Sequence, residues 1–171
     1  MNLKTNFLAF FLILISGIIT SSQEVFKNKD LGALSLVNWR LRTGGFLNKT
    51  NLPFYDFFNF NTQPFPVLLN SYDGAFMIPA YYSLNTPDFY GEVHLKYTTP
   101  YLLLKLLPAL SNTLMRENLS ILSLSTTSKR TYTEIGYSLS ELLLIGEIGI
   151  YAGFENMRYR NIGVKLVFKL N

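Results

Sequence analysis

Strict alternation of apolar and polar residues is the feature that most limits how this chain can fold. It runs through four segments of the second half and recurs earlier, where Val37, Trp39 and Leu41 are separated by polar residues. Successive side chains of a β-strand point to opposite faces, so each segment is predicted to be a strand with one apolar face. The four segments are Glu92–Tyr97, Glu134–Ser140, Glu147–Glu155 and Ile162–Leu170.

Short polar links separate these segments, at Thr127–Arg130, around Ile145–Gly146 and at Asn156–Arg158. Consecutive strands with short links form antiparallel hairpins, so an all-β antiparallel meander is predicted. Arg116–Ser125 also resembles a strand, but its alternation slips near Leu122, which suggests a β-bulge.

The chain is 49% hydrophobic and only 15% charged, and these values bear on where the apolar faces lie. A soluble β-sandwich turns its apolar faces inward and covers the outside with charge. An outer-membrane barrel reverses this arrangement and places aromatic girdles at both membrane interfaces, where we expect Tyr97, Tyr132, Phe154 and Tyr159. The deciding observation is the side of the sheet that carries the aliphatic residues of the last two strands, namely Ile148, Ile150, Ile162, Val164 and Leu166.

Residues 1–22 have the composition of a secretory signal. Lys4 precedes the apolar run Phe7–Ile19, and small polar residues, including Thr20 and Ser22, follow it. The run is shorter than the ~20 residues that a transmembrane helix needs. We therefore expect an exported protein whose second region spans residues 23–171, with an uncleaved inner-membrane anchor as the alternative.

The middle of the chain, about residues 48–88, carries several prolines and many aromatic residues. Prolines at this density oppose central strands, so a long irregular loop is predicted before the strand-rich part at residues 89–171. Val67–Tyr72 and Ala75–Leu84 are weaker strand candidates.

The orientation in a membrane follows from the last strand. If this strand ends on the periplasmic side, the external segments are Asn156–Arg158, Thr127–Arg130 and the long loop. Leu102–Leu110 is then a candidate for a short interfacial helix.

No sequence motif of catalysis or cofactor binding occurs, and the chain has no cysteine and a single histidine, His94. We therefore predict a protein that is not an enzyme, with no catalytic residues, cofactor or metal. A net charge of +4 without a basic stripe gives no sign of nucleic-acid binding. The polar strand faces supply the candidate residues for a polar lumen: Arg40, Arg42, Glu92, His94, Lys96, Glu134, Glu147 and Lys165.

Amides and carboxylates lie among the aromatic rings of the long loop. Such a mixture binds a glycan or small ligand by stacking and hydrogen bonding, and the alternative is that the rings pack into the mouth of the barrel. The candidate ligand contacts are Asp56, Asn59, Asn61, Tyr81 and Tyr82.

Long stretches of the chain resemble a known family. They include the loop segment Leu52–Leu84 and the sequence segments FYGEVHLKY, YTEIGYSLSE and GFENMRYRNIGVKLVFKL. The chain is similar to the C-terminal barrel region of the uncharacterised Gram-negative outer-membrane proteins whose longer members carry an N-terminal carboxypeptidase-regulatory-like domain. The resemblance implies an integral outer-membrane β-barrel, partial or minimal, with a transport or surface-interaction role and no established chemistry.

The same resemblance implies partners: outer-membrane lipid, the barrel assembly machinery, and the upstream part of the barrel that this chain lacks. A closed outer-membrane barrel needs at least ~8 strands, and the sequence supplies about six to eight. We therefore expect either a minimal barrel or a C-terminal fragment of a larger one. The alternative is an exported soluble β-sandwich or barrel that binds a small ligand or glycan through its aromatic loop.

Overall fold

The computed structural model describes residues 23–32, 34–46, 57–63, 67–69, 74–78, 83–100, 102–103, 114–127, 131–142 and 146–168. The expected signal (1–22), most of the expected helix (104–110), and Asp56, Tyr81 and Tyr82 lie outside these residues. No helix in the described part of the chain is long and apolar enough to cross a membrane.

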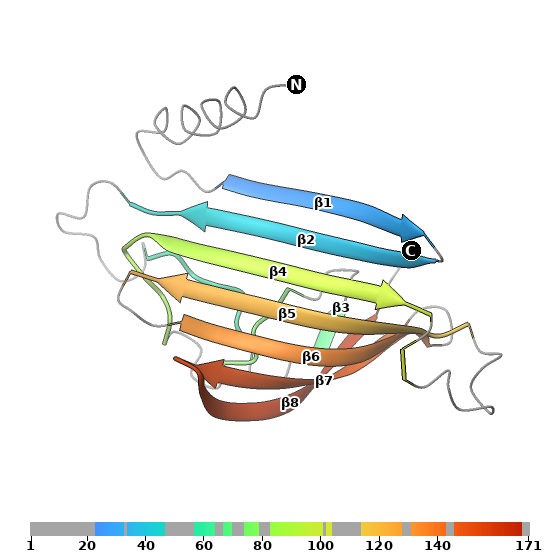
Figure 1. Cartoon of the computed structure of the whole chain (residues 1–171). Coiled ribbons are helices and arrows are strands. Elements are labelled where there is room, and N and C mark those ends of the chain that lie inside the picture. The colour runs from blue at the N-terminus through green and yellow to red at the C-terminus, as the bar shows by residue number, and fades with distance from the viewer. Residues whose placement is uncertain are drawn as a thin grey trace, which may run out of the picture.

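One sheet contains all the named strands (Figure 1). They are β1 (Gln23–Gly32), β2 (Ser35–Gly44), β3 (Val67–Leu69), β4 (Tyr90–Thr99), β5 (Arg116–Thr126), β6 (Thr131–Leu142), β7 (Gly146–Glu155) and β8 (Arg158–Phe168). Seven of them form an antiparallel meander, and β3 joins β8 in parallel, which gives the order β1-β2-β4-β5-β6-β7-β8-β3. Among the described residues β1 and β3 do not pair with each other, so the sheet is open.

The predicted all-β antiparallel meander is confirmed. Each segment with clear alternation lies in a long strand, except that Lys169 and Leu170 of the last segment are outside the described residues. Ala75–Leu84, a weaker strand candidate, contributes only an isolated bridge at Phe76 among its described residues. β1 was not among the predicted strands. β3 fits the proline-rich loop because a strand at the sheet edge tolerates a neighbouring proline, here Pro66.

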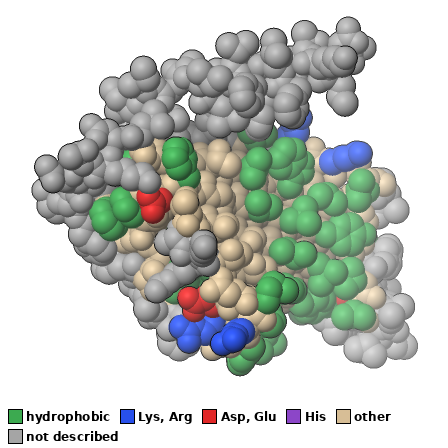
Figure 2. All heavy atoms as spheres, turned by 60° about the vertical axis from the view of Figure 1, so that its left-hand side comes forward, with side chains coloured by type: hydrophobic (Ala, Val, Ile, Leu, Met, Phe, Trp, Pro, Cys, Tyr) green, Lys and Arg blue, Asp and Glu red, His purple; other side chains and the backbone are tan. Residues whose placement is uncertain are grey.

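The two faces of the sheet differ sharply in chemistry. On the outer face, defined here as the side away from residues 57–63 and 74–78, aliphatic side chains are exposed to solvent, and Ile150 and Ile162 are 58% and 63% exposed. Figure 2 shows hydrophobic side chains gathered on one part of the surface, beside a region without them. The exposed aliphatic residues, which we call the apolar band, are Val93, Leu95, Leu119, Ile121, Ile135, Ile148, Ile150, Ile162 and Val164.

The opposite, inner face is polar and covered by chain from the long loop. Glu134, Ser138 and Lys165 are almost completely buried there. Figure 1 shows the sheet curving around the loop segments that fill its concave side. The loop contributes Phe60, Phe76, Met77, Ile78 and Leu84 to a core with Tyr90, Leu122, Leu124, Tyr132 and Tyr151 of the strands.

The predicted bulge near Leu122 is absent. β5 pairs with β4 and β6 without a register shift, and its side chains alternate regularly between the faces. The chemistry changes instead: the inner face passes from Asn118 and Ser120 to Leu122 and Leu124, while the outer face passes from Leu119 and Ile121 to Ser123 and Ser125. The apparent slip arises because loop residues need an apolar surface beneath them.

The expected aromatic girdle is only partly present. Phe154 and Tyr159 pack edge to face at one end of the outer face, with ring centroids 6.2 Å apart. Tyr132 points the other way and is buried in the core, at 3% exposure. Tyr97 lies opposite Val37 and Leu119, within the apolar band and not at its border.

Tyrosine rings on the inner face fill space above glycines. A Cβ on Gly136 would lie 2.1 Å from the ring of Tyr151, whereas a Cβ on Gly91 would meet nothing within 4 Å. We expect Gly136→Ala to destabilise the fold by about 1–3 kcal/mol through overpacking. Gly91→Ala is the matched control and should be close to neutral in the same denaturant titration. Equal effects of the two substitutions would contradict this packing.

Candidate functional site

A buried ion pair lies at the centre of the inner face. Lys165 of β8 and Glu134 of β6 are 1% and 0% exposed, and Nζ lies 2.6 Å from Oε2. The alternation of both strands places these side chains on the same face. A buried charge is stable only when it is paired and fully hydrogen-bonded, and further contacts meet this requirement.

Both charges reach the backbone of the loop segment 74–78. Lys165 Nζ donates to the carbonyl of Ala75 at 2.7 Å, and the backbone N–H of Met77 donates to Glu134 Oε1. Lys165 Nζ also lies 4.1 Å from the centroid of the Tyr151 ring. The ion pair therefore holds a stretch of loop at one donor and one acceptor.

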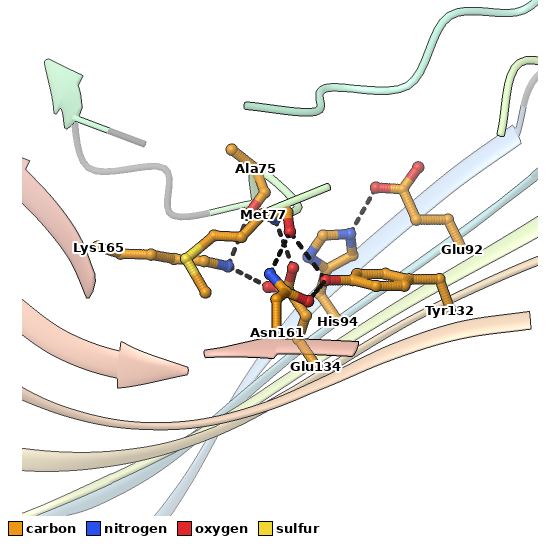
Figure 3. Close-up of polar contacts among 8 residues, drawn as sticks. All are labelled: Ala75, Met77, Glu92, His94, Tyr132, Glu134, Asn161 and Lys165. Carbon is orange, nitrogen blue, oxygen red and sulfur yellow. Dashed lines mark hydrogen bonds and ion pairs between the residues drawn. The ribbon is translucent and has the colours of Figure 1, made fainter. Parts of the chain in front are cut away.

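Two neutral side chains hold the same segment from neighbouring positions (Figure 3). Asn161 Nδ2 donates to the Met77 carbonyl at 2.7 Å, and the Tyr132 hydroxyl lies 2.9 Å from that oxygen and 3.0 Å from Asn161 Oδ1. We call Tyr132, Glu134, Asn161 and Lys165 the clamp. It binds the carbonyl of Ala75 and both polar backbone groups of Met77, which would otherwise be buried without partners.

A second polar network lies further along the inner face. Lys96 Nζ lies 2.9 and 2.8 Å from the two carboxylate oxygens of Glu147, and Ser138 donates to Oε1 at 2.6 Å. Asn118 adds β5 to this network, because its Oδ1 accepts from Thr98 of β4 at 2.7 Å and its Nδ2 donates to Ser138 of β6 at 3.2 Å. The network ties four strands together through side chains alone.

His94 and Glu92, both predicted for the polar lumen, form a third polar cluster on the inner face. His94 Nε2 lies 2.5 Å from Glu92 Oε1, and Arg42 reaches the other oxygen at 3.6 Å. The imidazole also packs against Phe76 of the loop, with centroids 5.3 Å apart. Arg40 lies opposite His94 in the β2–β4 register. All eight residues suggested for a polar lumen thus share the inner face.

The loop residues predicted to contact a ligand are less closely gathered than the polar residues of the strands. Asn59 Oδ1 accepts a hydrogen bond from Asn85, and both Asn59 and Asn61 are exposed. Phe58, Phe60 and Phe76 pack on one another or on strand residues, including a stacked Phe58–Tyr90 pair at 4.2 Å. For these three rings the structure agrees with the packing alternative.

Sequence reasoning missed the neutral members of the clamp and one carboxylate. Glu117 is 1% exposed and accepts hydrogen bonds from the N–H groups of Leu102 and Leu103, at 3.0 and 2.8 Å, and from the Tyr137 hydroxyl. Two successive N–H groups on one carboxylate resemble the start of a capped helix. The sequence signal for Glu117 was a glutamate at a position where the strand pattern calls for an apolar residue.

Chemically, these groups hold backbone and one another. No group of three or more His, Cys, Asp or Glu residues suited to a metal occurs in the described ranges. Of the clamp, only Glu134 and Lys165 are charged side chains, and both are buried beneath the loop segment. The arrangement is suited to retaining a segment of chain on a polar wall.

The searches of curated proteins and of solved structures found no match. Residues 21–139 match the family described as "Family of unknown function (DUF5686) C-terminal domain". The match covers β1 to most of β6, with the whole of the long loop, and extends over more than half of the chain. The chain belongs to this family of unknown function.

Proposed function

We propose that the chain is an integral outer-membrane β-barrel protein, or the C-terminal part of one, without enzymatic activity. The observation that carries the proposal is the inversion of the sheet: the aliphatic residues of β7 and β8 lie on the uncovered outer face, and buried glutamates and the buried Lys165 lie on the inner face. This inversion is expected where lipid surrounds the sheet and water or polar groups fill its interior.

A soluble protein has no reason to leave so much aliphatic surface exposed. Contiguous apolar patches beyond a few hundred Å² mark interaction or membrane surfaces. Ile150 and Val164 are directly opposite in the β7–β8 register, and Leu119 follows in the same row beyond Tyr137. The apolar band therefore runs across consecutive strands, as a lipid boundary requires.

The open edges bear on whether the barrel is complete. Unpaired backbone groups in lipid cost several kcal/mol each, so an open sheet is unstable in a bilayer. The family is named for the C-terminal domain of a larger protein. We propose that the edge of β1 pairs with additional strands, supplied by the upstream part of such a barrel.

The apolar band weakens at β1 itself. Lys27 and Lys29 lie opposite Trp39 and Val37 and are exposed on the outer face. Lysines in the middle of a lipid-facing band cost about 2–4 kcal/mol each. On this proposal the part of the outer face of β1 that carries Lys27 and Lys29 meets protein or water.

A transport or surface-interaction role fits the polar inner face, and the clamped loop fills that face. The segments 57–63 and 74–78 pack against β4–β8, so any solute path in this part of the chain must pass beside the loop or displace it. The proposal assigns no substrate.

The single tryptophan allows a direct test. Trp39 lies on the outer face of β2, directly opposite Leu95 of the apolar band. In vesicles containing brominated phospholipids, its fluorescence should be quenched strongly, with blue-shifted emission. The unbrominated lipid is the control. Unquenched fluorescence from protein that remains in the aqueous phase would refute the membrane proposal.

The second candidate is an exported soluble β protein that binds a ligand or glycan through the aromatic loop. The exposed amides of Asn59 and Asn61 favour it. In the same vesicle experiment this candidate predicts unquenched Trp39 and a protein that stays soluble after detergent phase separation.

A further inference from the structure

The hairpin between β7 and β8 has an unusually well fixed turn. Asn156 and Met157 both have positive φ, at 48° and 65°, as a two-residue type I′ turn requires. The Asn156 N–H donates to the Thr131 carbonyl at 2.8 Å, and its side-chain oxygen accepts from the Thr131 N–H at 3.0 Å. The turn is thereby fixed to β6, and the side chains next to it are held in place.

Two arginines follow this turn on β8, and one carboxylate, Glu155, precedes it on β7. Arg160 Nε donates to Glu155 Oε2 at 2.7 Å, which leaves the terminal nitrogens of that guanidinium for other acceptors. No ion pair joins Arg158 to any residue in the described ranges. The site carries an excess of positive charge, and a guanidinium binds phosphate oxygens with paired hydrogen bonds.

The same residues line an open surface hollow of about 540 Å³. Its walls are Glu155, Asn156, Arg158, Tyr159 and Arg160. The Tyr159 ring is braced by Phe154. A preorganised basic hollow of this size accommodates a phosphate group with part of the molecule that carries it.

The position of the hollow relative to the apolar band bears on the class of ligand that it binds. Arg160 is the extra residue of a register shift in β8, between Asn161 and Tyr159, and lies two residues before Ile162 of the apolar band. At the same level the outer face of β5 and β6 changes to hydroxyls, where Ser123 and Thr133 lie 3.1 Å apart. This is the level at which hydrocarbon gives way to lipid headgroups.

We propose that this hollow binds the phosphate group of an anionic glycolipid in the outer leaflet of the outer membrane. The inference rests on the proposed function, because it requires that the apolar band contact lipid and that the β7–β8 turn face outward. It adds a ligand class and a site that the fold alone does not specify.

The test measures binding of a phosphorylated diglucosamine lipid to the full chain in detergent, with the same lipid lacking phosphate as the reference. We expect the phosphorylated lipid to bind about 10-fold more tightly, equivalent to about 1.4 kcal/mol. Arg158→Gln with Arg160→Gln should abolish this preference. Lys27→Gln with Lys29→Gln removes the same charge from the outer face elsewhere and should preserve it.

Two results would overturn the inference: a preference that survives the arginine substitutions, or displacement of the lipid by millimolar inorganic phosphate, which would indicate a site for the free ion. Trp39 quenching in brominated vesicles distinguishes failure of the glycolipid site from failure of the membrane proposal. Quenched protein without phosphate preference refutes only the glycolipid site, whereas unquenched protein refutes the membrane proposal as well.

Discussion

Replacing Lys165 with Met should lower the free energy of unfolding by about 3–5 kcal/mol, because Glu134 is then left as an uncompensated buried charge. The methionine keeps most of the volume of the lysine stem, so a cavity contributes little. Ala75 also loses the donor for its carbonyl. The measurement is a urea titration in detergent, followed by Trp39 fluorescence.

The double variant Glu134→Leu/Lys165→Met distinguishes the ion pair from general damage to the core. It removes both charges, so it should recover part of the stability lost in the single variant. Lys27→Met, at an exposed lysine of β1, is the control for losing one positive charge without leaving a buried carboxylate unpaired. If the Lys165 variant were as stable as the Lys27 variant, the clamp would not hold the loop.

Placing arginine in the apolar band should have the second largest effect. Ile150 is 58% exposed on the outer face of β7, so Ile150→Arg creates no cavity and breaks no hydrogen bond. In a bilayer we expect a loss of about 2–4 kcal/mol, because a cation replaces a lipid-facing aliphatic group. In water the same exposed substitution would change stability by about 0.5 kcal/mol or less.

The control for this substitution lies on the same outer face beyond the band. Ser125→Arg on β5 should cost about 0–1 kcal/mol in vesicles, as expected near the membrane interface. The two variants are compared by folding efficiency and urea midpoint in phospholipid vesicles. Equal midpoints would argue that the outer face of β7 does not meet hydrocarbon.

Alternation revealed the long strands because each has a consistent apolar face. β7 is the clearest case: the predicted segment Glu147–Glu155 lies within Gly146–Glu155. β1 was not predicted because lysines occupy its outer face and polar residues such as Asn28 its inner face, so neither face is apolar. In β5 the apolar residues exchange faces while the geometry stays regular, and periodicity alone reads this exchange as a bulge.

The clamp was only partly predictable. The pattern placed Glu134 and Lys165 on polar strand faces, but nothing local indicates that they meet across the intervening strand. Nor does the sequence show that their partners are backbone groups of residues 75–77. Tyr132 was assigned to the outer face because tyrosine suits a membrane interface, yet the loop offered its hydroxyl a buried acceptor. Such contacts are set by tertiary packing.

The separation of the clamp along the chain has a consequence for the order of assembly. The hairpins of the meander form between neighbouring strands, but Lys165 and the Ala75 carbonyl that it binds are 90 positions apart. Closing so long a stretch carries an entropic cost before the contact is gained, and distant contacts form slowly. The contacts of residues 75–77 with the clamp can therefore be completed only after β8 has formed. Until then, the concave side of the strands that form earlier is not filled by this segment.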